Sequence, residues 1–358
     1  MSVLLRAEGL ARAYAAPGGL FAPRRLIRAV RDVSLTIARG EALALVGESG
    51  CGKSTVGRLL LRLEEADAGR IVFDGEDIRA LGAGRLRTLR RRMQPVFQDP
   101  YASLDPRRRI RDVLEAPIRL HRLREGAAVG ARAAELMVQV GLAPDGLDKL
   151  PHQFSGGQRQ RIAIARALAV EPDVIICDEP VSALDVSVQA QVVNLLAALQ
   201  REAGVALLFI SHDLAVVRHL ADRVAVMYAG RIVEEGATEE VFTTPRHPYT
   251  AGLIAAAPRT DRGRREHAPM AGEPPDPLSE PPGCAFAPRC ALAVARCRTE
   301  APALREIASG QRAACHRADD VPIPDAPAHA ADTPLARRLA LYRRARAAGA
   351  IEQEVPHA

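Results

Sequence analysis

The chain has no tryptophan, and aromatic residues make up only 3% of its 358 residues. Proteins that hold single-stranded nucleic acid use aromatic side chains as stacking platforms, so this scarcity argues against such a role. The net charge of +6 does not change that interpretation, because the arginines are spread along an alanine-rich chain. We therefore expect no nucleic-acid partner.

Long apolar runs are also absent. No stretch approaches the roughly 18 apolar residues that a membrane span needs. The first ten residues, MSVLLRAEGL, include Arg6 and Glu8, which interrupt what would have to be a continuous apolar signal segment. We expect a protein that stays in the cytoplasm, and the length predicts about two domains.

Lysine is scarce: of 49 lysines and arginines, only Lys53 and Lys149 are lysine. Lys53 lies in a glycine-rich turn, GESGCGKST at 47–55, between an apolar strand (41–46) and a helix with apolar residues at helical spacing. A glycine turn that arose by chance would not be expected between a strand and a helix. This context therefore predicts a P-loop, whose backbone N–H groups surround phosphate. A compact ammonium fits such a loop better than a planar guanidinium. The predicted contacts are Gly47, Ser49, Gly50, Cys51, Gly52, Lys53, Ser54 and Thr55, with Lys53 on the β/γ-phosphates and Ser54 on Mg²⁺.

Acidic and polar residues follow other predicted strands. Asp178 and Glu179 come directly after the apolar strand VIIC (174–177), and His212 follows VALLFI (205–210) closely. The carboxyl ends of parallel strands hold ligands in such sheets, so a solvated turn is the weaker interpretation. Asp178 is expected to bind Mg²⁺ and Glu179 to polarise the attacking water, while the amide of Gln98 contacts both.

The order of elements predicts an α/β fold. Short strands at 33–37 and 71–75 indicate an antiparallel sheet, 105–153 contains no strong strand signal, and strands and helices alternate again from 174. The predicted fold is a P-loop NTPase core with a parallel sheet, an antiparallel β subdomain, a helical subdomain and a Pro/Cys-rich C-terminal extension. The expected boundaries are an ATPase domain at 1–244 with its helical part at about 105–165, a four-cysteine region at 245–320, and a linker and basic tail helix at 321–358. The core is expected to end near Gly236.

A second glycine turn, FSGGQ at 154–158, opens another predicted helix. A serine cap followed by free N–H groups is an anion site as well as an ordinary helix start. Tyr14, taken alone, is better explained by packing, although its ring could stack on a nucleotide base.

Taken together and in this order, GESGCGKST, Gln98, FSGGQRQR, VIICDEP, SALD (182–185) and His212 resemble the ATP-binding cassette ATPases. In that family two cassettes pair head to tail, which explains two phosphate turns on one chain. The resemblance implies that Ser155, Gly156, Gly157 and Gln158 contact ATP held by the partner. It also implies that Asp185 joins the contact between cassettes, Tyr14 stacks on adenine, and His212 senses the γ-phosphate. Phe154 stands where the family usually has leucine, and Cys177 is also atypical.

A narrower resemblance rests on FQDPYASLDPR (97–107), HPYT (247–250) and GCAFAPRC (283–290). These segments are similar to the second ATPase of bacterial dipeptide and oligopeptide importers. That implies ATP and Mg²⁺ as cofactors, and a peripheral place on the cytoplasmic face of the inner membrane. The implied partners are a second ABC ATPase, two transmembrane permease subunits and, indirectly, an extracytoplasmic solute-binding protein. The solute stays open among dipeptides, oligopeptides, nickel complexes and glutathione. A soluble ABC ATPase of repair or translation, or a metal-responsive regulatory ATPase, are the alternatives.

Six cysteines divide into two groups. Cys51 and Cys177 are expected to be buried. The other four are Cys284, Cys290, Cys297 and Cys315. We do not expect them to form structural disulfides, because such bonds are rare in the cytoplasm. Their spacing matches neither paired-cysteine zinc ribbons nor the ferredoxin run. Two interpretations stay open: ligands of a metal or of a four-iron four-sulfur cluster, which some relatives carry here, or four free thiols. The basic helix expected after Thr333 is read as a solvated tail rather than a lipid-binding segment.

Overall fold

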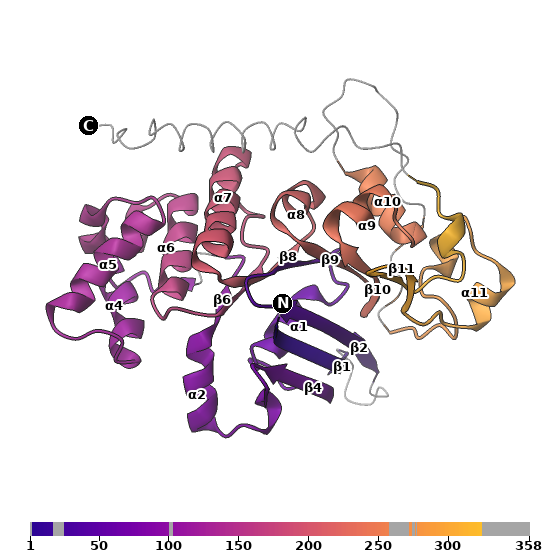
Figure 1. Ribbon diagram of the computed structural model, residues 1–358, viewed down its shortest axis with the longest axis horizontal. Coiled ribbons are helices and arrows are strands. Elements are labelled where there is room, and N and C mark those ends of the chain that lie inside the picture. Colours follow the sequence, from indigo (N-terminus) through magenta and orange to yellow (C-terminus); the bar gives the residue numbers. More distant parts are fainter. Residues whose placement is uncertain are drawn as a thin grey trace.

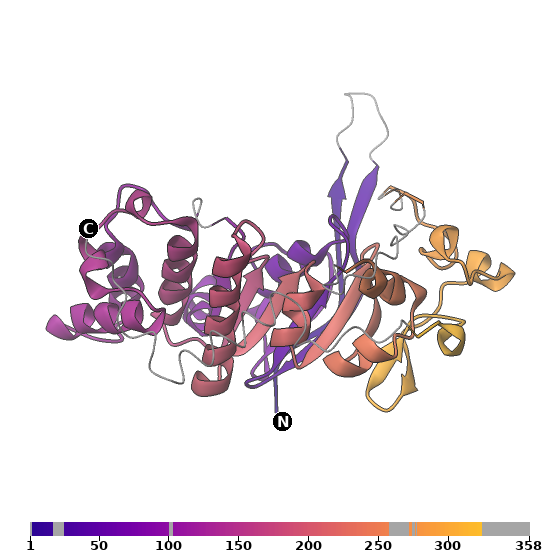
Figure 2. The same cartoon turned by 90° about the horizontal axis from the view of Figure 1, so that it is seen from above.

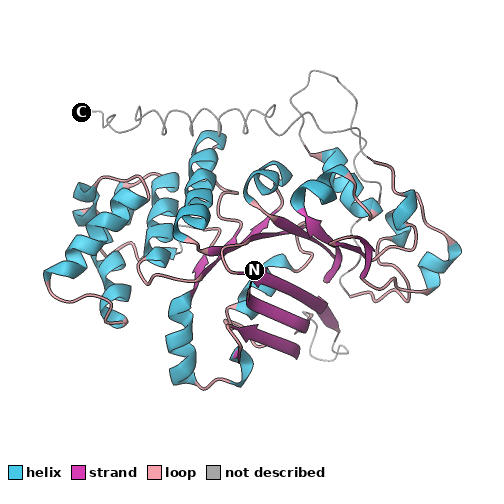
Figure 3. Ribbon diagram, in the orientation of Figure 1, coloured by secondary structure: helices cyan, strands magenta, loops and turns pink. Residues whose placement is uncertain are grey.

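A computed structural model describes residues 2–16, 25–99, 103–257, 272–273, 276 and 278–323. Its centre is an eight-stranded sheet in the order β11-β12-β10-β9-β3-β8-β7-β6 (Figures 1 and 3). The five strands from β9 to β6 run parallel. They are β9 (Arg223–Tyr228), β3 (Ala42–Val46), β8 (Ala206–Ser211), β7 (Val174–Asp178) and β6 (Met93–Val96).

Both faces of these strands are covered, as expected for a parallel sheet. All five residues of β3 are buried. Leu43 and Leu45 pack with α1 (Lys53–Leu60) and the antiparallel sheet, while Ala44 and Val46 share the opposite core with the other helices. Those helices include α7 (Val186–Ala203), α8 (Leu214–Leu220), α9 (Thr238–Thr243) and α10 (Pro248–Ala256), which lie above the sheet in Figure 1.

The antiparallel sheet has the order β2-β1-β4-β5. Its strands are β1 (Val3–Ala15), β2 (Leu26–Ala38), β4 (Ala68–Phe73) and β5 (Glu76–Asp77), followed by η1 (Ile78–Ala80) and α2 (Ala83–Arg92). The sequence pattern missed β1 entirely. Tyr14 therefore does not precede the first strand: it lies near the end of β1 and pairs with Ile27.

At one end of the molecule a group of helices projects from the sheet (Figure 2). It contains α4 (Ile110–Leu120), α5 (Ala127–Gln139), η2 (Pro144–Asp148), η3 (Pro151–Gln153) and α6 (Gly156–Leu168). The described part of the 105–153 segment contains no strand, as the sequence predicted. Buried side chains of α4, α5 and α6 belong to the same apolar cluster as α7 and the sheet.

The opposite end is formed by residues 278–323, here called the C-terminal lobe (Figure 2). It contains η4 (Ala287–Arg289), α11 (Ala295–Thr299), β11 (Arg305–Ala308), β12 (Gln311–Ala313) and η5 (Ala318–Asp320). The expectation that the core ends near Gly236 is wrong, because β12 pairs with β10 (Arg231–Ala237) and extends the central sheet. Pairing covers what would be an exposed sheet edge. The predicted basic tail helix lies outside the described residues. Among the helices that are described, none is both long and apolar enough to span a membrane.

Candidate nucleotide site

The turn at 47–55 connects β3 to α1, as predicted. Gly47 and Gly52 have φ values of +154° and +107°. A Cβ atom at Gly47 would lie 2.2 Å from the Met227 carbonyl oxygen, and one at Gly52 would lie 2.1 Å from that of Ala29. Only glycine allows the backbone to pass so close to its neighbours. The free N–H groups at the start of α1 therefore face the space enclosed by this loop.

Lys53 is nearly buried, at 4% exposure. Its Nζ donates hydrogen bonds to the carbonyl oxygens of Gly47 at 2.8 Å and Glu48 at 2.9 Å. The ammonium therefore lies inside the turn. Burial of Cys51 raises the pKa of its thiol, so this sulfur acts as a small packed side chain rather than as a thiolate.

Ser54 and Asp178 meet although they lie far apart in the sequence. The Ser54 hydroxyl donates to the Asp178 carboxylate at 2.8 Å. Burial raises the pKa of Asp178 above its usual value; the Ser54 hydrogen bond opposes this shift, and the neighbouring Glu179 charge adds to it. A divalent cation beside this pair would offset that cost, and hydroxyl, carboxylate and amide oxygens are the ligands Mg²⁺ prefers. The residues present therefore fit a Mg²⁺ ion.

Glu179 lies at the junction of the predicted catalytic groups. Its φ of +46° is uncommon for a residue with a side chain, and its N–H donates to the Ile210 carbonyl at 3.0 Å. Gln98 Nε2 lies 3.4 Å from one carboxylate oxygen and His212 Nδ1 3.4 Å from the other. The structure thus brings together Gln98, Glu179 and His212 from the ends of β6, β7 and β8.

The second glycine turn caps α6. The Gln158 N–H donates to Ser155 Oγ at 3.3 Å, and the Ser155 N–H donates to Gln158 Oε1 at 2.9 Å, which is a capping box. Ser155 is exposed. Gly157 also has a packing reason, since a Cβ there would lie 2.0 Å from Val188 Cγ1. Asp185 is exposed at the start of α7.

The two glycine turns belong to different neighbourhoods. Helix α6 contacts α4, α5, α7 and β6, whereas α1 contacts β2, β7 and β8. Tyr14 also has its own local partners: its hydroxyl bonds to Glu64, and the Arg12 guanidinium lies 5.0 Å from its ring centroid. The adenine-stacking role of Tyr14 stays a prediction.

Sequence reasoning missed the partners of Glu48. Its N–H donates to the Tyr249 hydroxyl at 2.8 Å, and its carboxylate pairs with Arg289 at 2.9 and 3.0 Å. Tyr249 belongs to the HPYT segment and Arg289 directly precedes Cys290. In the sequence, both residues are visible only as members of these segments, and no local pattern assigns partners to Glu48.

The four cysteines of the tail converge. Cys284, Cys290, Cys297 and Cys315 all line one small cavity. Burial raises the pKa values of Cys284 and Cys290, and raises that of Cys315 to about 11, with a further contribution from the neighbouring cysteines in each case. Within the described ranges, no group of three or more His, Cys, Asp or Glu side chains is arranged to hold a single metal ion.

Two family models match the chain. The ABC transporter model covers residues 30–182, and the model of the oligopeptide/dipeptide transporter C-terminal region covers residues 233–297. The probable peptide ABC transporter ATP-binding protein y4tS of Sinorhizobium fredii is 50% identical over 350 residues, covering 97% of this chain and 98% of that protein. The chain belongs to the ABC transporter ATPases. The dipeptide transport ATP-binding protein DppF of Escherichia coli is 48% identical over 317 residues, covering 88% of this chain and 95% of DppF.

Solved structures agree with this placement. This ABC ATPase matches the dimeric, post-hydrolysis cassette MJ0796 with bound ADP and phosphate at a TM-score of 0.59 and 28% identity, covering 66% of this chain and 99% of that one. It matches CbiO1 of Clostridium perfringens at a TM-score of 0.58 and 29% identity, covering 68% of this chain and 91% of that one. The predicted fold class and the predicted ATPase activity are confirmed, with ATP as the nucleotide.

Proposed function

We propose that this ABC ATPase powers the import of peptides across the cytoplasmic membrane. The observation that carries the proposal is that one chain matches both the ABC transporter model and the oligopeptide/dipeptide C-terminal model. The names of its relatives point the same way. These findings favour a transporter over a repair or translation ATPase and over a metal-responsive regulator. The solute is a dipeptide, an oligopeptide or a related compound.

In the proposed assembly the protein lies on the cytoplasmic face of the inner membrane, beside a second ABC ATPase and two permease subunits. A solute-binding protein delivers the peptide from the other side. Residues 1–244 form the ATPase domain in this proposal, 245–320 the importer-specific region, and 321–358 a linker and tail. Tyr14 would stack on adenine.

The proposed chemistry is attack of water on the γ-phosphate, which forms a bond from the water oxygen to the γ-phosphorus and breaks its bond to the bridging oxygen, so that ADP leaves. Ser54, Asp178 and Gln98 would hold Mg²⁺, which when bound would neutralise charge on the phosphates. Lys53 would turn its ammonium from the loop carbonyls to the β/γ-phosphates. Glu179 would accept the proton of the attacking water, and its contact with His212 would hold the imidazole on the γ-phosphate side. The strained backbone of Glu179 supports this role, since such strain gathers at functional sites.

The turn at Ser155 would bind ATP held by the second ATPase. Its exposure and its capping geometry support this, because a helix start with free N–H groups attracts phosphate. Gly156, Gly157 and Gln158 belong to the same turn, and Asp185 would join the contact between the two cassettes.

The experiment is purification of the complex from native membranes, followed by reconstitution in vesicles containing ATP. We expect permease subunits and a second ATPase to accompany this chain, and peptide with its binding protein to stimulate ATP hydrolysis. A Glu179→Gln complex provides the matched control, because it should assemble but not transport. A chain that purifies without any membrane protein would contradict the proposal.

The C-terminal lobe is proposed to hold a four-iron four-sulfur cluster. Four cysteines around one cavity support it, and a cubane cluster is wider than a single ion, so its ligands need not meet the geometry of an ion site. When bound, the cluster would cross-link a lobe that has little apolar core. Protein purified without oxygen should contain about four irons per chain, and Cys315→Ser should lose them. Iron-free protein, or zinc in place of iron, would contradict the cluster.

A further inference from the structure

Glu48, the second residue of the phosphate loop, is held at both its backbone and its side chain. The Tyr249 hydroxyl accepts its N–H at 2.8 Å. Arg289 Nη1 and Nη2 donate to its two carboxylate oxygens at 2.9 and 3.0 Å. Such a two-point pair fixes orientation as well as distance. Tyr249 and Arg289 both lie within residues 233–297, which match the model of the oligopeptide/dipeptide transporter C-terminal region.

The Arg289 side chain is itself fixed. It is only 6% exposed, against 26% for Glu48, so the pair is largely removed from solvent. The Tyr228 hydroxyl lies 3.4 Å from Arg289 Nη1, and the guanidinium lies 5.8 Å from the centroid of the Phe286 ring. The bond to Glu48 is the main cause that raises the Arg289 pKa above its usual value.

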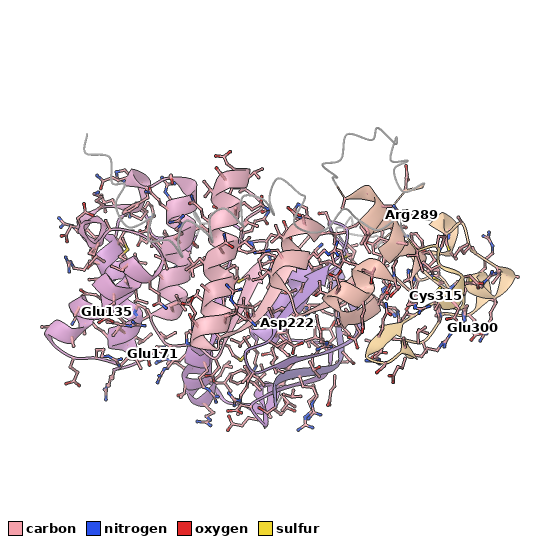
Figure 4. The ribbon with its side chains drawn as sticks, turned by 45° about the horizontal axis from the view of Figure 1, so that its top comes forward. Glu135, Glu171, Asp222, Arg289, Glu300 and Cys315 are labelled. Carbon is pink, nitrogen blue, oxygen red and sulfur yellow. The ribbon has the colours of Figure 1, made fainter. Side chains whose placement is uncertain are left out.

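Three aromatic rings pack against one another beside this contact. Tyr228 and Tyr249 have ring centroids 4.5 Å apart, and Phe286 lies 5.3 Å from Tyr228 and 5.5 Å from Tyr249. These rings come from β9, α10 and the C-terminal lobe. Figure 4 labels Arg289 in this lobe, nearer the rest of the molecule than Glu300. A displacement of the lobe would therefore be transmitted to Glu48.

The contact between Arg289 and Glu48 should affect nucleotide binding, because Glu48 lies in the phosphate loop. Glu48 directly follows Gly47, and its carbonyl accepts a hydrogen bond from Lys53. An anionic side chain in a loop that receives several phosphate charges would repel them unless its charge is matched by a cation. Arg289 supplies that cation and directs the carboxylate towards the C-terminal lobe.

We infer that Arg289 of the C-terminal lobe is a positioning residue for ATP binding. Arg289 neutralises the Glu48 carboxylate and thereby fixes the phosphate loop. The inference rests on the proposed role of the 47–55 loop as the phosphate site. If so, the importer-specific region (245–320) contributes to nucleotide binding by supporting the phosphate loop. The region acts through Glu48 and does not itself contact phosphate.

The test is a double-mutant cycle on the full chain, with ATP affinity measured by equilibrium binding. Arg289→Ala should weaken ATP binding roughly tenfold, the order expected for one uncompensated charge about 12 Å from a phosphate charge at an effective dielectric of about 20. In a Glu48→Gln background the same change should cost less than about twofold, because the carboxylate is gone. Arg289→Lys keeps the charge and should recover part of the loss. Arg296→Ala is the matched control, since Arg296 lies in the same lobe, is 62% exposed and pairs with Glu300.

A second readout uses nucleotide-free protein. Amide hydrogen exchange in residues 48–53 should be faster in Arg289→Ala than in the wild type or in Arg296→Ala. Limited proteolysis shows whether the lobe remains folded in each variant. A tenfold loss of affinity in both Glu48 backgrounds would mean that Arg289 acts through the lobe's structure, and an unchanged affinity would mean that it has no role; either result overturns the inference. Lys53→Ala tests the phosphate site separately from the role of Arg289, because wild-type ATP affinity in that variant would overturn the phosphate site itself.

Discussion

The pH dependence of stability should contain a contribution from one buried carboxylate. Glu234, in β10, is fully buried. Its carboxylate accepts hydrogen bonds from the Arg246 and His247 N–H groups at 2.7 and 2.9 Å and from Gln311 Nε2 at 2.9 Å. It thereby connects the cassette, the HPYT segment and β12 of the C-terminal lobe. Burial nevertheless raises its pKa from 4.5 to about 7, against the opposing effect of these donors.

The sign follows from proton binding. Between pH 4.5 and 7 the unfolded chain loses the Glu234 proton while the folded protein keeps it, so stability falls as pH rises through this window. At 1.36 kcal/mol per pKa unit, the full contribution is about 3 kcal/mol. His247 has the opposite slope: burial lowers its pKa from 6.5 to about 3, so its contribution to stability is lost as pH falls from 6.5 towards 3. The two slopes oppose each other between pH 4.5 and 6.5.

Comparison with Glu234→Gln isolates the carboxylate. The amide does not titrate, so the stability of the wild type should fall relative to that of the variant by about 3 kcal/mol between pH 4.5 and 7. At pH 4.5 the variant should be less stable than the wild type, because an amide has only one accepting oxygen for these donors; this deficit should shrink as the pH rises towards 7. Native-state amide exchange in β10 and β12, corrected for intrinsic rates, measures the local free energy of opening.

Glu240→Gln is the matched control, since it removes an exposed carboxylate from α9 and should leave the profile unchanged. If the wild-type and Glu234→Gln curves run parallel from pH 4.5 to 7, Glu234 does not titrate in this window and the reasoning from burial fails. A difference that grows towards acid pH would show that the hydrogen bonds outweigh burial.

Three further changes test the nucleotide site. Glu179→Gln should keep ATP binding but lower hydrolysis by ~10² to 10⁴, because an amide cannot accept the proton from water; near-normal phosphate release would refute this role. Lys53→Arg should abolish hydrolysis despite keeping the charge, since the buried ammonium fits between the Gly47 and Glu48 carbonyls and a planar fork does not; full activity would contradict that fit. Ser155→Arg should leave ATP binding to the isolated chain intact but remove cooperative hydrolysis with the second ATPase, and loss of binding by the monomer would place this turn in the local site.

The glycine turn at 47–55 and the two acids that follow β7 were predictable because their signals are local. The strand, the glycines and the helix of the P-loop are contiguous in sequence, and the strained turn at Gly47 and Gly52 needs glycine whatever the rest of the chain does. Glu179 and His212 could be brought together without a structure, because parallel strands deliver their carboxyl ends to one edge of a sheet. The sequence did not predict that β7 and β8 are neighbours in the sheet.

The contacts of the C-terminal lobe could not be found in the same way. Strand β12 has three residues, too few for an alternating pattern, and it becomes a strand only by pairing with β10 and β11. Arg289 lies 241 positions from Glu48 in the sequence, in a chain whose 49 basic residues include only two lysines. No arginine stands out against that background, so its role is set by where folding places it. Lys53 was visible for the opposite reason, since it is a rare residue at a position with a strong local pattern. A sequence therefore reveals the residues that a motif requires more readily than the residues that hold the motif in place.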